Sequence, residues 1–82
     1  MKQVEWTDAS LDDMSALDKG IAHRVKQAVE RFAKTGVGGV KRLQGIDPPE
    51  YRLRVGDYRV RFDYHGETIR ILRVRHRREA YR

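Results

Sequence analysis

Arginine carries the clearest chemical signal in this 82-residue chain, and it is concentrated toward the C-terminus. Residues 51–82 contain ten arginines, no lysine and four acidic residues, so they carry the whole net charge of +6. A one-sided positive field points to a polyanionic partner: nucleic acid, an anionic membrane surface or an acidic protein. Because a guanidinium group binds phosphate or carboxylate through two parallel hydrogen bonds, the exclusive use of arginine favours bidentate recognition.

Four of these arginines alternate with apolar residues around a Gly56-Asp57 turn signal. A two-residue or four-residue turn would place Arg54 opposite Arg59, and Arg52 opposite Arg61, on one face of a hairpin. Like charges directly across a strand pair destabilise a sheet, and an anion bound on that face would compensate them. The alternatives are neutralisation by nearby carboxylates, or a three-residue turn that changes the pairing.

A second cluster of potential functional groups lies at the end of the chain. It comprises Arg73, Arg75, His76, Arg77, Arg78, Tyr81 and Arg82. His76 is interpreted either as a hydrogen-bonded strand end or as a catalytic residue, and Tyr81 either as a packing aromatic or as part of the site. The sequence lacks metal-ligand spacing, a glycine-rich phosphate loop before a helix, and a serine or cysteine nucleophile arrangement. Any catalysis is therefore expected to use Arg, His and Tyr without a metal or other cofactor.

Hydrophobic periodicity predicts the elements that would hold these side chains. A short strand over 4–6 is followed by a helix capped by Thr7 or Asp8, with one face formed by Leu11, Met14 and Leu17. A second helix, capped by Asp18 and ended by Gly36, places apolar residues on one side. These are Ile21, Val25, Ala28, Val29 and Phe32.

Residues 40–50 are predicted to form a loop, and the apolar period then changes to two. Strands are expected on both sides of Gly56-Asp57, with a third strand over 69–75 after a turn at 65–67. The alternation slips between Ile71 and Leu72, which indicates a β-bulge or a strand covered on both faces. The predicted order βααβββ is an α+β domain over residues 1–82, with a three-stranded antiparallel meander and helices packed on one sheet face.

The remaining composition bears on the compartment. The chain has no cysteine, no apolar run long enough to span a membrane, and no apolar stretch typical of a signal peptide near its start. A reducing, cytoplasmic location without membrane contact is the expectation.

Two motifs resemble the RelE/ParE superfamily of bacterial toxins, and the RelE-like mRNA interferase branch in particular. They are Tyr51-Arg-Leu-Arg-Val-Gly-Asp-Tyr-Arg59 and Arg75-His-Arg-Arg-Glu-Ala-Tyr81. The resemblance covers nearly the whole chain, because the element order and the length also fit. It implies the toxin of a type II toxin–antitoxin system: a metal-independent endoribonuclease that cleaves mRNA in the ribosomal A site and is silenced by a cognate antitoxin. The implied reaction is attack of a ribose 2′-hydroxyl on the adjacent phosphate.

The resemblance also implies roles for individual residues. Arg59 matches the family's phosphate-binding arginine, Arg77 its C-terminal arginine near the leaving group, and Tyr81 its C-terminal tyrosine. Arg52 and Arg54 stand where some members have lysines that take part in proton transfer. Since arginine is a poor proton shuttle, that transfer would fall to His76, Tyr81 or water. Further contacts to ribosomal RNA are expected from Arg42, Arg61, Arg73, Arg75 and Arg78.

Two other functions remain open at this point. A toxin similar to the ParE branch would inhibit DNA gyrase without cleaving RNA, and the same fold serves both activities. A non-catalytic RNA-binding domain would show RNA affinity that falls with salt, and no cleavage.

Overall fold

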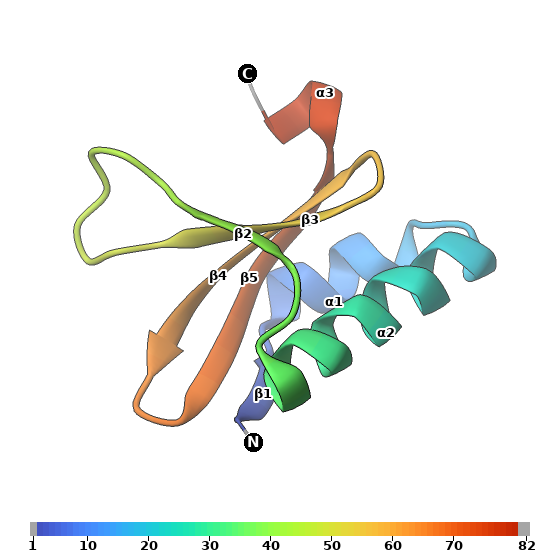
Figure 1. Ribbon diagram of the computed structural model, residues 1–82. Coiled ribbons are helices and arrows are strands. Elements are labelled where there is room, and N and C mark those ends of the chain that lie inside the picture. The colour runs from blue at the N-terminus through green and yellow to red at the C-terminus, as the bar shows by residue number, and fades with distance from the viewer. Residues whose placement is uncertain (1, 81–82) are drawn as a thin grey trace.

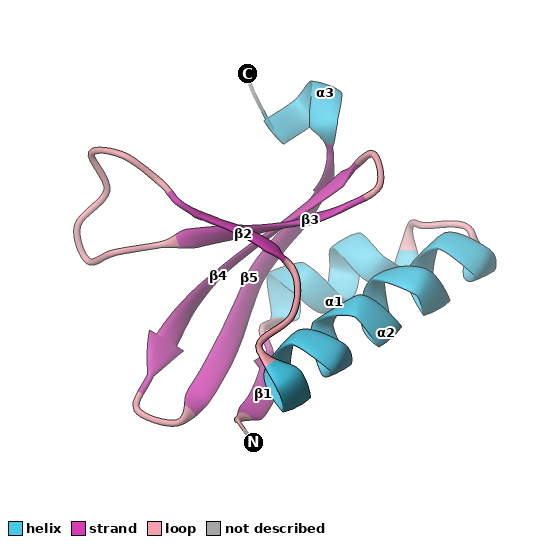
Figure 2. Cartoon of the chain, in the orientation of Figure 1, coloured by secondary structure: helices cyan, strands magenta, loops and turns pink. Residues whose placement is uncertain are grey.

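A twisted five-stranded sheet with two helices across one face forms the protein in the computed structural model, which describes residues 2–80 (Figures 1 and 2). The strand order is β1-β5-β4-β3-β2, with β1 parallel to β5 and all other neighbours antiparallel. The expected α+β architecture is confirmed. In chain order the elements are β1 (Gln3–Trp6), α1 (Asp8–Ser15), α2 (Lys19–Thr35), β2 (Gly39–Arg42), β3 (Tyr51–Val55), β4 (Tyr58–His65), β5 (Thr68–His76) and α3 (Arg77–Ala80).

The ends of the two long helices follow the predicted capping signals. Thr7 caps α1 by accepting a hydrogen bond from the Ser10 backbone N–H, and Asp18 caps α2 in the same way from Gly20. Gly36 ends α2 with a φ of 75°, a left-handed conformation that glycine adopts without strain. These local signals fix the two helices in the order and place that the sequence predicts.

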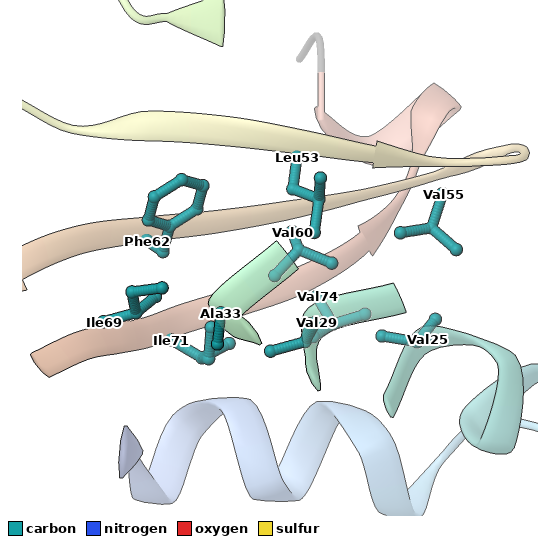
Figure 3. Packing of buried hydrophobic residues seen from close by; sticks show 10 residues of the cluster. All are labelled: Val25, Val29, Ala33, Leu53, Val55, Val60, Phe62, Ile69, Ile71 and Val74. Atoms are coloured by element: carbon teal, nitrogen blue, oxygen red, sulfur yellow. The ribbon is translucent and has the colours of Figure 1, made fainter. Parts of the chain in front are cut away.

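The core lies between α2 and the sheet (Figure 3). Its buried hydrophobic residues are Val25, Val29, Ala33, Leu53, Val55, Val60, Phe62, Ile69, Ile71 and Val74. The prediction for the first helix was partly wrong. Met14 and Leu17 pack against the core, but Leu17 follows the end of α1 and Leu11 is 52% exposed.

The hairpin formed by β3 and β4 has the predicted two-residue turn. Arg54 pairs with Arg59 and Arg52 with Arg61. Gly56, the first turn residue, has a φ of 57°, which explains the glycine at this position. The apolar partners of these strands point to the helices, so the arginines lie on the opposite face of the sheet.

A β-bulge in β5 resolves the predicted slip in its alternation. Arg61 pairs with Arg73 and Phe62 with Ile71, so Leu72 is the extra residue on β5. The bulge reverses which residues face the core. Ile71 and Val74 are therefore both buried, and Arg73 remains on the face that carries the arginines of β3 and β4.

Two elements were missed by the sequence prediction. The segment 40–50 is not wholly a loop, because Gly39–Arg42 pairs with β3 as an edge strand and makes the meander four-stranded. All four β2 residues are exposed, so they show no apolar alternation that could have revealed the strand. The short helix α3 follows β5 directly. Within residues 2–80, no helix combines the length and the apolar character needed to cross a membrane.

Candidate functional site

The sheet face opposite the helices is named the basic face. It carries Arg52, Arg54, Arg59, Arg61, Arg70, Arg73 and Arg75 in cross-strand register. The row nearest the Gly56-Asp57 turn, the turn row, is Arg54–Arg59–Arg75, and the next is Arg52–Arg61–Arg73. Directly opposed residues have Cβ atoms about 5 Å apart, so each row brings three positive side chains close together.

Away from the turn row, carboxylates neutralise several arginines. Arg61 donates to Glu50 Oε1 through Nε and Nη2. Arg70 forms a bidentate pair with Asp63, with distances of 3.1 and 2.8 Å, and this bond raises the pKa of Arg70 above its ordinary value. In each pair two hydrogen bonds fix the guanidinium group in place. The predicted neutralisation by carboxylates therefore applies to this part of the face.

The outer edge of β5 provides another pairing. Arg73 donates two hydrogen bonds of 2.9 Å to Asp13 of α1, and the Val74 backbone N–H donates to the same carboxylate. Partial burial acts to raise the pKa of Asp13, but the bonds from Arg73 and Val74 hold it below the ordinary value. Asp13 thus accepts a hydrogen bond from the edge of β5 beyond the end of β1, and it also forms an ion pair with Arg73.

Arg59, at the centre of the turn row, has a different environment. The residue is only 7% exposed. Its Nη1 donates hydrogen bonds to the carbonyl oxygens of Gly56 and Tyr58, both at 3.0 Å. Its Nε is buried and has no hydrogen-bond partner, and no carboxylate within residues 2–80 forms an ion pair with Arg59. A buried charge without a counter-charge is costly, which marks Arg59 as a position that an anion would stabilise.

The remaining positive groups near Arg59 are more exposed. Arg54 and Arg77 are exposed, and no carboxylate in the described part of the chain pairs with either. Arg75 lies 3.9 Å from Glu79 of α3, a weak surface pair. The end of the basic face near the turn therefore combines one buried cation with exposed neighbours.

The turn itself connects Arg59 with α3. The Gly56 carbonyl accepts from Arg59, and the adjacent Asp57 carbonyl accepts the Arg77 backbone N–H at 2.7 Å. His76 pairs with Tyr58 and packs edge-on against its ring, so it lies on the helix-bearing face rather than the basic face. The structure thus brings Arg59 and the start of α3 together, and it separates His76 from the arginines of the turn row.

The other predicted residues are spread around this end and beyond it. Arg52 is half-buried in the second row, Arg78 is exposed on α3, and Arg42 is exposed on the edge strand β2. Tyr81 lies outside the described residues. Sequence reasoning did not assign Asp13 and Glu50 to their arginine partners. Asp13 is 60 residues away from Arg73 in the chain, and no local pattern connects them.

The comparisons agree with this architecture. The sequence model described as the ParE toxin of the type II toxin–antitoxin system parDE matches residues 4–81. The RelB–RelE antitoxin–toxin complex from Methanococcus jannaschii contains a similar chain, with 26% identity, a TM-score of 0.76 and 94% of each chain covered. No curated protein sequence matches significantly.

Two further solved structures share the fold at lower identity. The RelE–RelB complex from Pyrococcus horikoshii has 24% identity and a TM-score of 0.76, with 93% of this chain and 94% of the other covered. YafQ from Escherichia coli has 12% identity and a TM-score of 0.76 over 100% of both chains. The predicted resemblance to the RelE/ParE superfamily is confirmed. Because the family model matches nearly the whole chain, the chain belongs to the ParE toxin family of type II toxin–antitoxin systems.

Proposed function

We propose that this toxin is an endoribonuclease that cleaves mRNA in the ribosomal A site. The observation that carries the proposal is Arg59 at the centre of a row of three arginines, a buried guanidinium that has no carboxylate partner among residues 2–80. A phosphate group would supply the missing counter-charge and could accept from the unpartnered Nε. The exposed Arg54 and Arg77 would bind the neighbouring phosphate groups of the same RNA strand.

The chemistry of RNA cleavage suits a surface of this kind. The ribose 2′-oxygen forms a bond to phosphorus while the bond from phosphorus to the 5′-oxygen breaks, which leaves a 2′,3′-cyclic phosphate and a 5′-hydroxyl. Negative charge grows on the phosphoryl oxygens, and cations already in place stabilise it. We assign this role to Arg59, with Arg54 and Arg52 as electrostatic support. Arg77 would stabilise charge at the leaving oxygen. The proposed reaction uses these side chains and needs no metal ion.

The protons are assigned to other groups. The 2′-hydroxyl must lose a proton and the 5′-oxygen must gain one, and arginine remains protonated at neutral pH. His76 lies on the helix-bearing face of the sheet, whereas Arg59 lies on the basic face. In this proposal Tyr81 or water carries the protons. The 2′-hydroxyl requirement restricts cleavage to RNA.

The proposed partners follow from the charge and from the similar structures. Several of those structures are complexes of a toxin with its antitoxin, which supports a cognate antitoxin for this chain. Ribosomal RNA in the cytoplasm is the proposed second partner. Exposed Arg42 and Arg78 would contribute most to its binding, and Arg75 less. Arg61 and Arg73 would contribute least, because carboxylates already engage them.

The direct test is translation in vitro with mapping of mRNA ends. The wild-type protein should cut within codons in the A site, whereas Arg59→Ala and Arg77→Ala should each cut at least about a hundredfold more slowly. Equal cutting by all three proteins would reject the assigned site. RNA binding that falls with salt, without any cutting, would instead identify a non-catalytic RNA-binding domain.

Inhibition of DNA gyrase is the second candidate, and the ParE description of the matching family model favours it. The fold does not choose between the two activities. A supercoiling assay with purified gyrase separates them. Loss of supercoiling at toxin concentrations that leave mRNA intact would replace the nuclease proposal, and undisturbed supercoiling would remove this candidate.

A further inference from the structure

We propose that His76 is a positioning residue whose neutral imidazole caps α3 and thereby holds Arg77 against the Gly56-Asp57 turn. The proposal rests on the proposed nuclease function for its catalytic consequence, but its structural basis is independent of that function. It begins with one contact: the Arg78 backbone N–H donates to His76 Nδ1 at 3.2 Å.

This contact requires a particular tautomer of the ring. A backbone N–H can only donate, so Nδ1 must be the unprotonated nitrogen and the ring proton must be on Nε2. His76 immediately precedes α3 and bonds to the second residue of the helix, as an N-cap side chain does. The imidazole therefore satisfies a backbone donor that a four-residue helix would otherwise leave exposed.

The ring is itself held in place from the core side. It packs against Tyr58 with ring centroids 5.3 Å apart and an angle of 85° between the planes. Edge-to-face contacts of this kind are favourable and directional. Because Tyr58 immediately follows the Gly56-Asp57 turn, the same hairpin end orients the imidazole and accepts the Arg77 N–H.

Three contacts thus attach α3 to one end of the sheet. The Asp57 carbonyl holds the Arg77 backbone, His76 holds that of Arg78, and Glu79 lies 3.9 Å from Arg75. Arg59 donates to the neighbouring Gly56 carbonyl, so one turn fixes both Arg59 and the start of α3. Loss of the cap should misplace Arg77 relative to Arg59 while the core stays intact. His76 also points away from the basic face, which fits positioning better than proton transfer.

Two substitutions separate the cap from the ring. His76→Asn retains a side-chain acceptor suited to an N-cap, and His76→Phe retains the aromatic contact with Tyr58 but has no acceptor. In the full-length protein, nitrogen NMR should show the wild-type imidazole neutral with its proton on Nε2. The Arg78 amide should exchange with solvent about tenfold faster in His76→Phe, and His76→Asn should restore most of the protection. A proton on Nδ1, or equal exchange in wild type and His76→Phe, would overturn the cap.

Steady-state cleavage kinetics on programmed ribosomes test the consequence for Arg77. His76→Phe should lower kcat about tenfold with KM unchanged, and His76→Asn should recover most of that loss. In an Arg77→Ala background His76→Phe should have little further effect, because the two changes remove the same contribution. The exposed His65 provides a matched control, and His65→Phe should leave kcat unchanged.

The outcomes distinguish this inference from the proposed function. If His76→Asn is as slow as His76→Phe, or if His76→Phe is additive with Arg77→Ala, the ring acts in its own right and the positioning role is rejected. If the wild-type protein does not cleave RNA at all, the nuclease proposal fails, while the NMR measurements still decide whether His76 caps α3.

Discussion

At the end of the basic face farther from the Gly56-Asp57 turn, Arg61, Arg70 and Arg73 are each held by a carboxylate. At the turn end, Arg59 is bonded to backbone carbonyls, and no ion pair in the described part of the chain involves Arg54. The residue type and the sheet face are the same at both ends. The two ends differ in how firmly carboxylates engage their arginines, because the only such contact described in the turn row is the 3.9 Å pair of Arg75 with Glu79.

This difference shows why the number of arginines is a poor guide to a binding surface. A guanidinium already engaged by a carboxylate must give up that partner before it can bind a phosphate. A buried guanidinium without a carboxylate gains a counter-charge when phosphate binds. We therefore expect the far end to stabilise the sheet and the turn end to provide the proposed anion site.

The largest expected effect is on the proposed RNA cleavage at the turn end. Arg59→Lys keeps the positive charge but removes the planar group that donates to two carbonyls and presents Nε. We expect the rate of A-site cleavage to fall about a hundredfold. Arg70→Lys, the same change outside the proposed site, should stay within about threefold of wild type. Similar losses in both variants would remove the distinction between the two ends.

The next effect is on stability at the far end. Arg70→Ala removes the bidentate partner of Asp63, which is only 6% exposed and would keep only the longer contact with His65, at 3.8 Å. The melting temperature measured by circular dichroism should fall by about 5 °C or more. Arg54→Ala should leave it nearly unchanged, because Arg54 is exposed. A larger drop for Arg54→Ala than for Arg70→Ala would contradict the assignment of roles.

The smallest effect concerns Asp13, which accepts hydrogen bonds from Arg73 and from the Val74 backbone at the edge of β5. Its pKa is below the ordinary value of 3.8 in the folded protein, so its ionised form stabilises the fold above that pH. This contribution should be lost as the pH falls through the lowered folded pKa. Urea unfolding should show Asp13→Asn less stable than wild type by about 1 kcal/mol at neutral pH. The difference should shrink below pH about 4, and a pH-independent difference would disprove the linkage.

The sequence predicted the β3–β4 hairpin well because its determinants are local. A glycine that suits a positive φ and a strict alternation on both sides fixed the pairing of Arg54 with Arg59. The slip between Ile71 and Leu72 correctly indicated a bulge. β2 was missed because an exposed edge strand of four residues needs no apolar pattern.

The chemical state of each arginine was not predictable in this way. The ion pair between Arg73 and Asp13 depends on how α1 crosses the edge of β5. The burial of Arg59 depends on how its side chain folds back toward the turn. Both are tertiary properties, so the sequence indicated a charged face but not which of its members are already paired.

The parallel pairing of β1 with β5 has a consequence for the protein during its own synthesis. Residues 3–6 leave the ribosome early, but they pair with residues 68–71. The strand that contains these partners, β5, also pairs with the central strand β4. Contacts so distant in sequence form only after a large loop closes, and here the last strand must first emerge. A nascent or prematurely terminated chain therefore lacks the assembled basic face. The toxin therefore acquires this face only after β5 has been synthesised.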